Sequence, residues 1–168
     1  DRTCVFGEYA RRLLVEQSVY PASAVTVTGQ AMMDERPVAE REWGERGADG
    51  EKLRKEILPD GCDRLLLFAS QHVYRSFIGP RVIKAFADSD RRNFMVVRPH
   101  PLEAPQPFWR DLIARHGLEH RVMVRGGDSL ERWLDACDVL ISATSTVLNE
   151  AVAFGRATIV TGARELGD

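Results

Sequence analysis

The 168-residue sequence lacks the usual marks of a membrane-spanning, disulfide-linked or metal-binding protein. No apolar run approaches the roughly 20 residues that cross a bilayer, and no secretory signal peptide is visible. The three cysteines, Cys4, Cys62 and Cys137, are far apart and form no CxxC or Cys/His metal spacing. We therefore expect reduced, buried thiols, a cytoplasmic location and no bound metal.

The sequence also lacks a strong net charge and two familiar phosphate-binding fingerprints. The formal net charge is −2, so no overall basic field would attract nucleic acid. Neither GxGxxG nor GxxxxGK[ST] occurs, which excludes a dinucleotide fingerprint and a P-loop. With 44% hydrophobic and 29% charged residues, the chain has the composition of one ordinary globular domain.

What the sequence does contain is a regular alternation of apolar runs and helical patterns from residue 64 onwards. The alternation predicts an α/β fold, a Rossmann-like parallel sheet with helices on both faces. The helix after the first strand is predicted to begin at Pro80, and Asp128 is predicted to cap a later helix. The apolar runs typical of buried parallel strands lie near residues 65–69, 94–97, 122–125, 139–141 and 158–160.

The first 60 residues are organised differently from the rest. Residues 1–30 carry one strand–helix–strand pattern. Residues 31–60 hold many charges, Pro37 and three glycines, so we predict a linker followed by a short helix near 51–58. The domain with the regular alternation is then predicted to occupy residues 61–168.

Polar residues follow three of the predicted strands. Because the carboxyl ends of parallel strands meet at one edge of a sheet, we expect these side chains to face one common cleft, where open α/β sheets bind their ligands. They are Gln71 and His72 after 65–69, Arg98 and His100 after 94–97, and Ser142, Thr144, Ser145 and Thr146 after 139–141.

Each of these groups has a functional and a structural interpretation. His100 stands between Pro99 and Pro101, and this fixed loop either directs the imidazole at a phosphate or is simply a turn. Arg98 is suited to a bidentate contact with an oxyanion. The hydroxyl-rich stretch after 139–141 opens a helix, so its hydroxyls either contact phosphate or cap that helix. Glu150, inside that helix, either accepts hydrogen bonds from a ribose or is solvated.

Five short motifs together resemble the carboxyl-terminal half of bacterial surface-carbohydrate transferases of the GT-B fold. That group includes capsule polysaccharide synthesis proteins, polysialyltransferases and CDP-glycerol glycerophosphotransferases. The resemblance spans nearly the whole chain and depends on the order and spacing of the motifs. They are Phe-Gly-Glu-Tyr at 6–9, Val-Thr-Gly-Gln at 27–30, Phe-Ala-Ser-Gln at 68–71, Arg-Pro-His-Pro at 98–101, and Ser-Ala-Thr-Ser-Thr at 142–146 with Glu150, Ala151 and Gly155.

The resemblance implies roles for several of these residues. His100 matches the His-Pro histidine that binds the nucleotide-sugar donor, and Glu150 matches a ribose-binding acid. Ser142, Thr144, Ser145 and Thr146 match the hydroxyl-rich phosphate motif. Residues 1–30 resemble the end of the amino-terminal domain or the crossover from it.

The chain departs from the GT-B pattern in its length. A GT-B enzyme has two Rossmann-like domains with the active site between them, and 168 residues suffice for only one. We therefore expect the domain that binds a saccharide or lipid-linked acceptor, and that usually carries the catalytic base, to lie outside these residues. We expect these residues alone to be inactive, and the full-length protein to lie in the cytoplasm at the inner face of the membrane.

These observations lead to one hypothesis and two alternatives. The hypothesis is the donor-binding domain of a glycosyltransferase that uses a CMP-, CDP- or UDP-linked sugar or polyol in surface polysaccharide synthesis, without a separate cofactor. The mechanism would be a direct displacement in which the leaving nucleotide is stabilised electrostatically, without a metal. The alternatives are half of a UDP-sugar 2-epimerase-like enzyme, which shares this half-fold, and a non-catalytic nucleotide-binding module.

Overall fold

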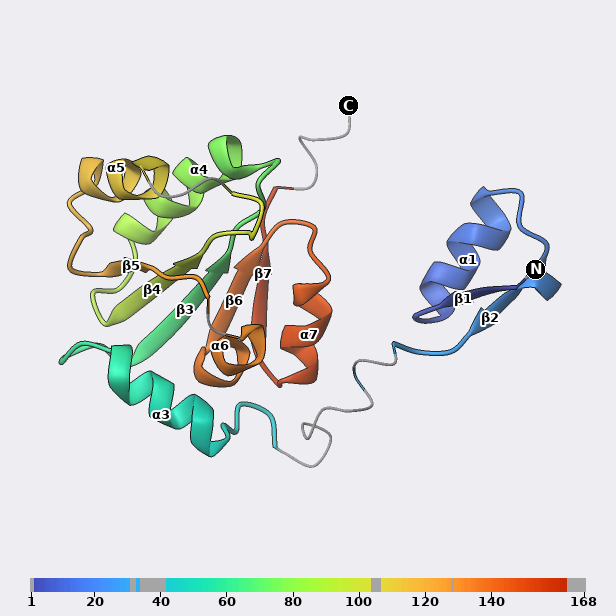
Figure 1. Ribbon diagram of the computed structural model, residues 1–168, viewed down its shortest axis with the longest axis horizontal. Coiled ribbons are helices and arrows are strands. Elements are labelled where there is room, and N and C mark those ends of the chain that lie inside the picture. The colour runs from blue at the N-terminus through green and yellow to red at the C-terminus, as the bar shows by residue number, and fades with distance from the viewer. Residues whose placement is uncertain (1, 31–32, 34–41, 104–106, 128, 163–168) are drawn as a thin grey trace. The chain divides into compact units, whose positions relative to one another are not determined.

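The computed structural model describes residues 2–30, 33, 42–103, 107–127 and 129–162 (Figure 1). The chain divides into two compact units, residues 1–40 and residues 41–168. Most of the linker predicted to begin at residue 31 lies outside the described residues, as do residues 163–168 and Asp128, the predicted cap.

The first unit is a small β–α–β segment. Strand β1 (Thr3–Val5) pairs in parallel with β2 (Val25–Val27), and helix α1 (Glu8–Gln17) and the 3₁₀ turn η1 (Ala22–Ala24) connect them. Val5 and Val25 are buried, whereas α1 buries none of its residues. The expected strand–helix–strand pattern is thus confirmed, and its assignment to the end of an amino-terminal domain stays a prediction.

The second unit is built on a five-stranded sheet in which every pair of neighbours is parallel. The spatial order is β5-β4-β3-β6-β7. The chain therefore builds outward from β3 in one direction, then returns and builds outward from β6 in the other. This confirms the predicted parallel sheet. The strands are β3 (Arg64–Ala69), β4 (Asn93–Arg98), β5 (Val122–Val124), β6 (Val139–Ser142) and β7 (Ala157–Val160).

Helices cover both faces of this sheet, as predicted (Figure 1). Because the crossovers of parallel strands are right-handed, the reversal of direction between β3 and β6 puts the helices that follow β3 and β4 on one face and the helix that follows β6 on the other. Helices α4 (Arg75–Ala87) and α5 (Pro107–Arg115) lie on one face, and α3 (Ala48–Ile57), α6 (Leu130–Ala136) and α7 (Val147–Ala153) on the other. The core under α4 and α5 joins Ile83 and Trp109 to strand residues such as Phe68 and Met95.

Helix α4 begins at Arg75, so the predicted start at Pro80 is wrong. A proline inside a helix cannot donate to the carbonyl four residues before it, which weakens the helix. Tertiary packing outweighs that loss here, because Ile78 and Gly79 are buried against the rest of the unit. A Cβ at Gly79 would lie 2.9 Å from a ring atom of Trp109, so the glycine lets α4 approach α5 closely.

Helix α6 is capped by Ser129, not by the predicted Asp128. The Ser129 hydroxyl accepts a hydrogen bond from the Arg132 N–H at 3.3 Å. A serine hydroxyl reaches this third N–H of the helix from the residue immediately before the first turn. The interpretation as a helix start is therefore correct and the capping residue is displaced by one position.

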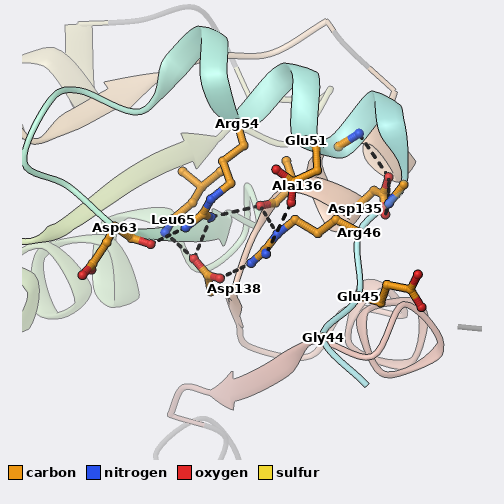
Figure 2. Close-up of polar contacts among 12 residues, drawn as sticks. Gly44, Glu45, Arg46, Glu51, Arg54, Asp63, Leu65, Asp135, Ala136 and Asp138 are labelled. Carbon is orange, nitrogen blue, oxygen red and sulfur yellow. Dashed lines mark hydrogen bonds and ion pairs between the residues drawn. The ribbon is translucent and has the colours of Figure 1, made fainter. Parts of the chain in front are cut away.

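At the amino edge of the sheet, two aspartates bind the segment that leads into α3 (Figure 2). The Asp135 carboxylate accepts the N–H groups of Gly47 and Gly50, at 3.0–3.1 Å, and so caps α3 from another helix. The Asp138 carboxylate accepts hydrogen bonds from Arg46, from Arg54 at 2.7 Å and from the Leu65 N–H at 2.7 Å. We call Arg46, Arg54, Asp135, Asp138 and Arg156 the amino-edge network.

Arg156 is the most deeply buried member of this network, with 1% of its surface exposed. Its guanidinium donates to the carbonyls of Gly44, Glu45, Leu134 and Asp135 at 2.7–3.0 Å. Together with the bonds to Asp135 and Asp138, these contacts fasten residues 44–54 to the second unit. The described end of the predicted linker is therefore an integral part of that unit.

The cysteines differ from one another in exposure. Cys137 is buried, and burial raises the pKa of its thiol to about 12. Cys4 is exposed and Cys62 is partly exposed, so the expectation of buried thiols is wrong for Cys4. Cys4 lies on a strand of the small first unit, which buries only one face of that strand. Within the described ranges, no helix is long and apolar enough to cross a membrane.

Candidate functional site

The candidate site lies at the carboxyl ends of β3, β4 and β6. Strands β3 and β6 are neighbours in the sheet, yet the chain leaves β3 toward β4 and leaves β6 toward β7. In open α/β sheets, such a reversal separates the two flanking loops and leaves a crevice in which ligands bind. The three polar clusters predicted from the sequence lie at the ends of these strands, with Arg98 and Ser142 as the last residues of β4 and β6.

Gln71 and Thr144 join the loops on the two sides of this reversal. The Thr144 N–H and hydroxyl both donate to the Gln71 side-chain oxygen, at 3.2 and 3.1 Å. The loops after β3 and β6, which are 73 residues apart in sequence, therefore meet through side chains that the sequence analysis selected. The predicted convergence is confirmed for this pair.

His72 and His100 bring the loops after β3 and β4 together. Their ring centroids lie 5.1 Å apart, with the ring planes tilted by 40°. His100 Nδ1 accepts the Leu102 N–H at 3.1 Å, so the proton of the neutral ring is on Nε2. Nε2 is then a hydrogen-bond donor, the form that contacts a phosphate oxygen.

Glu103 holds the loop that carries His100. One of its carboxylate oxygens accepts the His100 N–H at 3.0 Å, and the other accepts the indole N–H of Trp109 at 2.9 Å. Trp109 is buried in α5, so the carboxylate ties the loop to the core. Neighbouring prolines and this double anchor together fix the direction of the imidazole.

The hydroxyl-rich stretch divides between structural and exposed positions. Ser142 is fully buried and donates to the Ala69 carbonyl at 3.0 Å, so the expectation that it faces the cleft is wrong. The Ser145 hydroxyl accepts the Val147 N–H at 3.3 Å and caps the start of α7. Thr146 makes no side-chain capping bond. A hydroxyl between two buried parallel strands satisfies a carbonyl at the strand end, which the sequence pattern does not reveal.

Glu150 and Arg98 are less accessible than a surface position would be. The Glu150 side chain is 6% exposed, so the solvated alternative is wrong. Arg98 ends β4, where its carbonyl accepts the Ser70 N–H at 3.0 Å, and its side chain is half-buried. The ribose contact of Glu150 and the oxyanion contact of Arg98 both stay predictions.

A small pocket at the end of β3 adds residues that the sequence analysis did not select. Arg75 was missed because the predicted helix began at Pro80, which left Arg75 in a loop without a role. The signal available was a basic residue close to a predicted strand end. The pocket is lined by Phe68, Ala69, Ser70, Gln71, Tyr74, Arg75, Ile78 and Ala143. Elsewhere among the described residues, no group of three or more His, Cys, Asp or Glu side chains is arranged to hold a metal ion.

No protein-family model matches the sequence, and no curated protein matches it. Solved structures do match in fold. HepE from Anabaena in complex with UDP superposes with a TM-score of 0.64 at 16% identity, over 95% of this chain and 44% of that chain. A glycosyltransferase from Rickettsia africae ESF-5 gives 0.65 at 17% identity, over 100% of this chain and 47% of that chain.

An epimerase is similar to the same degree. UDP-GlcNAc 2-epimerase from Neisseria meningitidis, bound to UDP-GlcNAc, gives a TM-score of 0.62 at 17% identity, over 91% of this chain and 42% of that chain. The chain thus spans less than half the length of each of these proteins. At these identities the likeness shows the fold, which is one Rossmann-like half of a GT-B fold.

Proposed function

We propose that the chain is the donor-binding domain of a glycosyltransferase that uses a nucleotide-linked sugar or polyol in bacterial surface polysaccharide synthesis. The observation that carries the proposal is the meeting of three loops at the reversal of strand order. Gln71 bonds Thr144 across it, and His72 packs against His100 beside it. A ligand with both a nucleoside and a phosphate part needs groups from several strand ends, and this edge supplies them.

The similar structures support a nucleotide-linked donor. HepE is bound to UDP and the Neisseria epimerase to UDP-GlcNAc, and each has a half with the fold of this chain. Among the CMP-, CDP- and UDP-linked donors that the sequence motifs suggest, these two favour a uridine nucleotide. The role in capsule or other surface polysaccharide synthesis rests on the sequence motifs alone.

The chemistry assigned to this chain is stabilisation of the leaving nucleotide. An acceptor hydroxyl attacks the activated carbon or phosphorus, the bond to the nucleotide phosphate breaks, and that phosphate leaves with the bonding electrons. The His100 Nε2–H would donate to the departing phosphate, and Arg98 would add positive charge. The acceptor and the base that takes its proton would be held by another domain, so the chain alone would be inactive.

The cellular setting follows from the same proposal. A saccharide or lipid-linked acceptor would be brought by the other domain of the full-length protein. The protein would act in the cytoplasm, at the inner face of the membrane, where it would meet such an acceptor. Nucleic acid is not a proposed partner, because the net charge of −2 provides no overall attraction.

A second candidate is half of a UDP-sugar 2-epimerase, favoured by the similarity to the Neisseria enzyme. Product analysis with the full-length protein separates the two. An epimerase converts UDP-GlcNAc without an acceptor, whereas a transferase releases the nucleotide only when an acceptor is present. A module that binds nucleotides and does neither would be non-catalytic.

The test is calorimetric titration of the chain with CMP, CDP, UDP and their sugar conjugates. We expect at least one diphosphate or its sugar conjugate to bind, and Thr144→Val to weaken it, because valine removes the hydroxyl that bonds Gln71 and keeps the side-chain shape. His116→Ala, at an exposed position after α5, is the matched control and should bind like the wild type. If none of the nucleotides binds the folded chain, the donor-binding proposal is wrong.

A further inference from the structure

The start of helix α4 faces the candidate site without a local cap. The helix runs for 13 residues, and Tyr74, the residue before it, makes no side-chain capping bond. The first N–H groups of a helix lack the usual carbonyl partner four residues earlier, and they carry the positive end of the helix dipole. In α4 the Phe77 N–H donates to the Tyr74 carbonyl at 3.1 Å, which leaves the N–H groups of Arg75 and Ser76 for a ligand. By contrast α7, whose start the sequence analysis selected, is seven residues long and is capped by Ser145.

Ser70 provides a second, independent observation at the same place. Its side chain is buried, with 5% of its surface exposed, and it lines the pocket at the end of β3. Its hydroxyl has no hydrogen-bond partner among the residues that the structure describes. Buried hydroxyls in folded proteins are nearly always hydrogen-bonded, so an unpartnered one facing a pocket indicates a partner that is not part of the chain.

Arg75 completes the set from the first residue of α4. Its guanidinium carbon lies 4.9 Å from the centroid of the Phe108 ring, so an aromatic face holds the side chain in place. Its Nε is buried without a hydrogen-bond partner in the described ranges, and the residue lines the same pocket as Ser70. Because the Phe108 ring holds the Arg75 guanidinium in place and its Nε–H has no acceptor in the described ranges, Arg75 is suited to bind an anion.

The chemistry of the pocket selects one kind of ligand. Its polar lining comprises Ser70, Gln71, Tyr74 and Arg75, which include a guanidinium and no carboxylate. The enclosed space is about 10 Å³, about the volume that holds one water molecule. One oxygen of an oxyanion bound at the mouth fits this space, whereas a base or a sugar ring does not.

We propose that Ser70, Arg75 and the first turn of α4 form a phosphate subsite, which we call the Ser70–Arg75 pocket. The Ser70 hydroxyl, the Arg75 guanidinium and the backbone N–H groups of Arg75 and Ser76 would donate to the phosphate oxygens. The identity of the phosphate, one belonging to the nucleotide-linked donor, rests on the proposed function. Gln71 lines this pocket and also bonds Thr144, so the subsite lies beside the loops that would hold the rest of the donor.

Inorganic pyrophosphate is the probe, because it carries the anion without a nucleoside. The chain and the variants Ser70→Ala and Arg75→Gln are titrated with pyrophosphate and with UDP in a calorimeter. We expect each variant to weaken pyrophosphate binding at least tenfold, the effect of losing one hydrogen bond to a charged group. Arg81→Gln is the matched control on the same helix, because Arg81 lies over the Phe77 ring and does not line the pocket.

Thermal unfolding of the ligand-free variants gives a readout that a purely structural serine would not give. Ser70→Ala removes a buried hydroxyl without a partner, so its unfolding temperature should equal or exceed that of the wild type. A lower unfolding temperature would show that the hydroxyl has a structural partner and would overturn the subsite.

The outcomes also separate this proposal from the proposed function. If pyrophosphate fails to bind the wild type, or binds both pocket variants as tightly, the phosphate subsite is wrong, and UDP binding by the wild type still supports the donor-binding function. If the variants lose pyrophosphate while no nucleotide binds the wild type, the subsite stands and the donor-binding function is wrong.

Discussion

Two helix starts in the second unit differ in how their N–H groups are satisfied. At the amino edge of the sheet, the first turn of α3 is capped by Asp135, which reaches it from α6. At the carboxyl edge, Tyr74 provides no side-chain cap for α4, and the nearby Ser70 hydroxyl has no partner among the described residues. One edge is thus closed by the chain itself, and the other has capacity left for a ligand.

The charges at the two edges show the same contrast. Arg156 at the amino edge directs its guanidinium at four carbonyls of its own chain. Arg75 at the carboxyl edge rests on an aromatic ring and has a buried N–H without an acceptor in the described ranges. We therefore expect stability and binding to be separated along the strand direction, so that substitutions at the two edges have separable effects.

The largest expected effect is on stability, at the amino edge. Arg156→Met should lower the free energy of unfolding by about 3–5 kcal/mol, because it leaves buried carbonyls without donors and leaves Asp135 with less counter-charge. Urea unfolding measures the loss. Arg92→Met, which removes an exposed arginine paired with Asp63 and Asp90, is the control and should lose less than about 1 kcal/mol. A loss below about 1 kcal/mol for Arg156→Met would contradict the view that the amino edge mainly stabilises the fold.

The next effect is on binding, at the carboxyl edge. His100→Ala should weaken nucleotide binding by about 1–3 kcal/mol, the range for a hydrogen bond to a charged group. Its unfolding temperature should change little, because the imidazole supports no core packing and accepts one exposed N–H, that of Leu102. Calorimetry and thermal unfolding of the same sample give both numbers. Unchanged nucleotide affinity in a folded variant would show that the His-Pro loop has only a structural role.

Ser145→Ala tests a residue that should contribute both to stability and to nucleotide binding. Loss of the bond to the Val147 N–H should cost about 1 kcal/mol of stability, as for other helix caps. If the hydroxyl also contacts the donor, nucleotide affinity falls as well. Ser145→Gly, which restores part of the capping geometry, should recover stability but not affinity. Full recovery of both would restrict Ser145 to capping.

The smallest effect concerns acid stability at the amino edge. Hydrogen bonds from Arg92 lower the pKa of Asp90 from 3.8 to about 2. A depressed carboxyl pKa means that the contribution to stability is present above the unfolded-state pKa and is lost as the pH falls toward 2. The stability difference between wild type and Asp90→Asn should therefore shrink between about pH 5 and pH 2, and also in high salt, because the pair is exposed. Urea unfolding across this range would show a constant difference if the ion pair contributes nothing.

The sheet was predictable because its signal is local. Each strand is a short run of branched apolar residues such as Val139, Leu140 and Ile141, and each run is followed by a helical pattern. A parallel sheet then brings the strand ends together by topology alone, which is why Gln71 meets Thr144 and His72 meets His100 as expected.

The parts that were not predictable depend on contacts between distant residues. Ser142 looks like its hydroxyl neighbours, and only the adjacent Ala69 carbonyl on β3 assigns it a structural role. Arg46 and Asp138 are 92 residues apart and form an ion pair. No hydrophobic periodicity or local motif in the sequence indicates such a contact. Helix α4 was predicted to begin at Pro80 because proline favours the first turn of a helix, and Arg75 was therefore left outside it. Tertiary packing instead lets the helix begin at Arg75, with Pro80 in its interior.

Gly50 lies in the first turns of α3, where its N–H donates to Asp135. A Cβ at this position would lie 2.6 Å from the Asp135 carboxylate and from its backbone carbonyl carbon, which is closer than real Cβ atoms approach. Exchanging a helical glycine for alanine is a routine way to make a protein more heat-resistant, with a gain of about 1 kcal/mol. Here that exchange would push α3 away from the carboxylate that caps it. Consensus design and random libraries should therefore keep glycine at position 50 and look for thermal gains elsewhere on the helix.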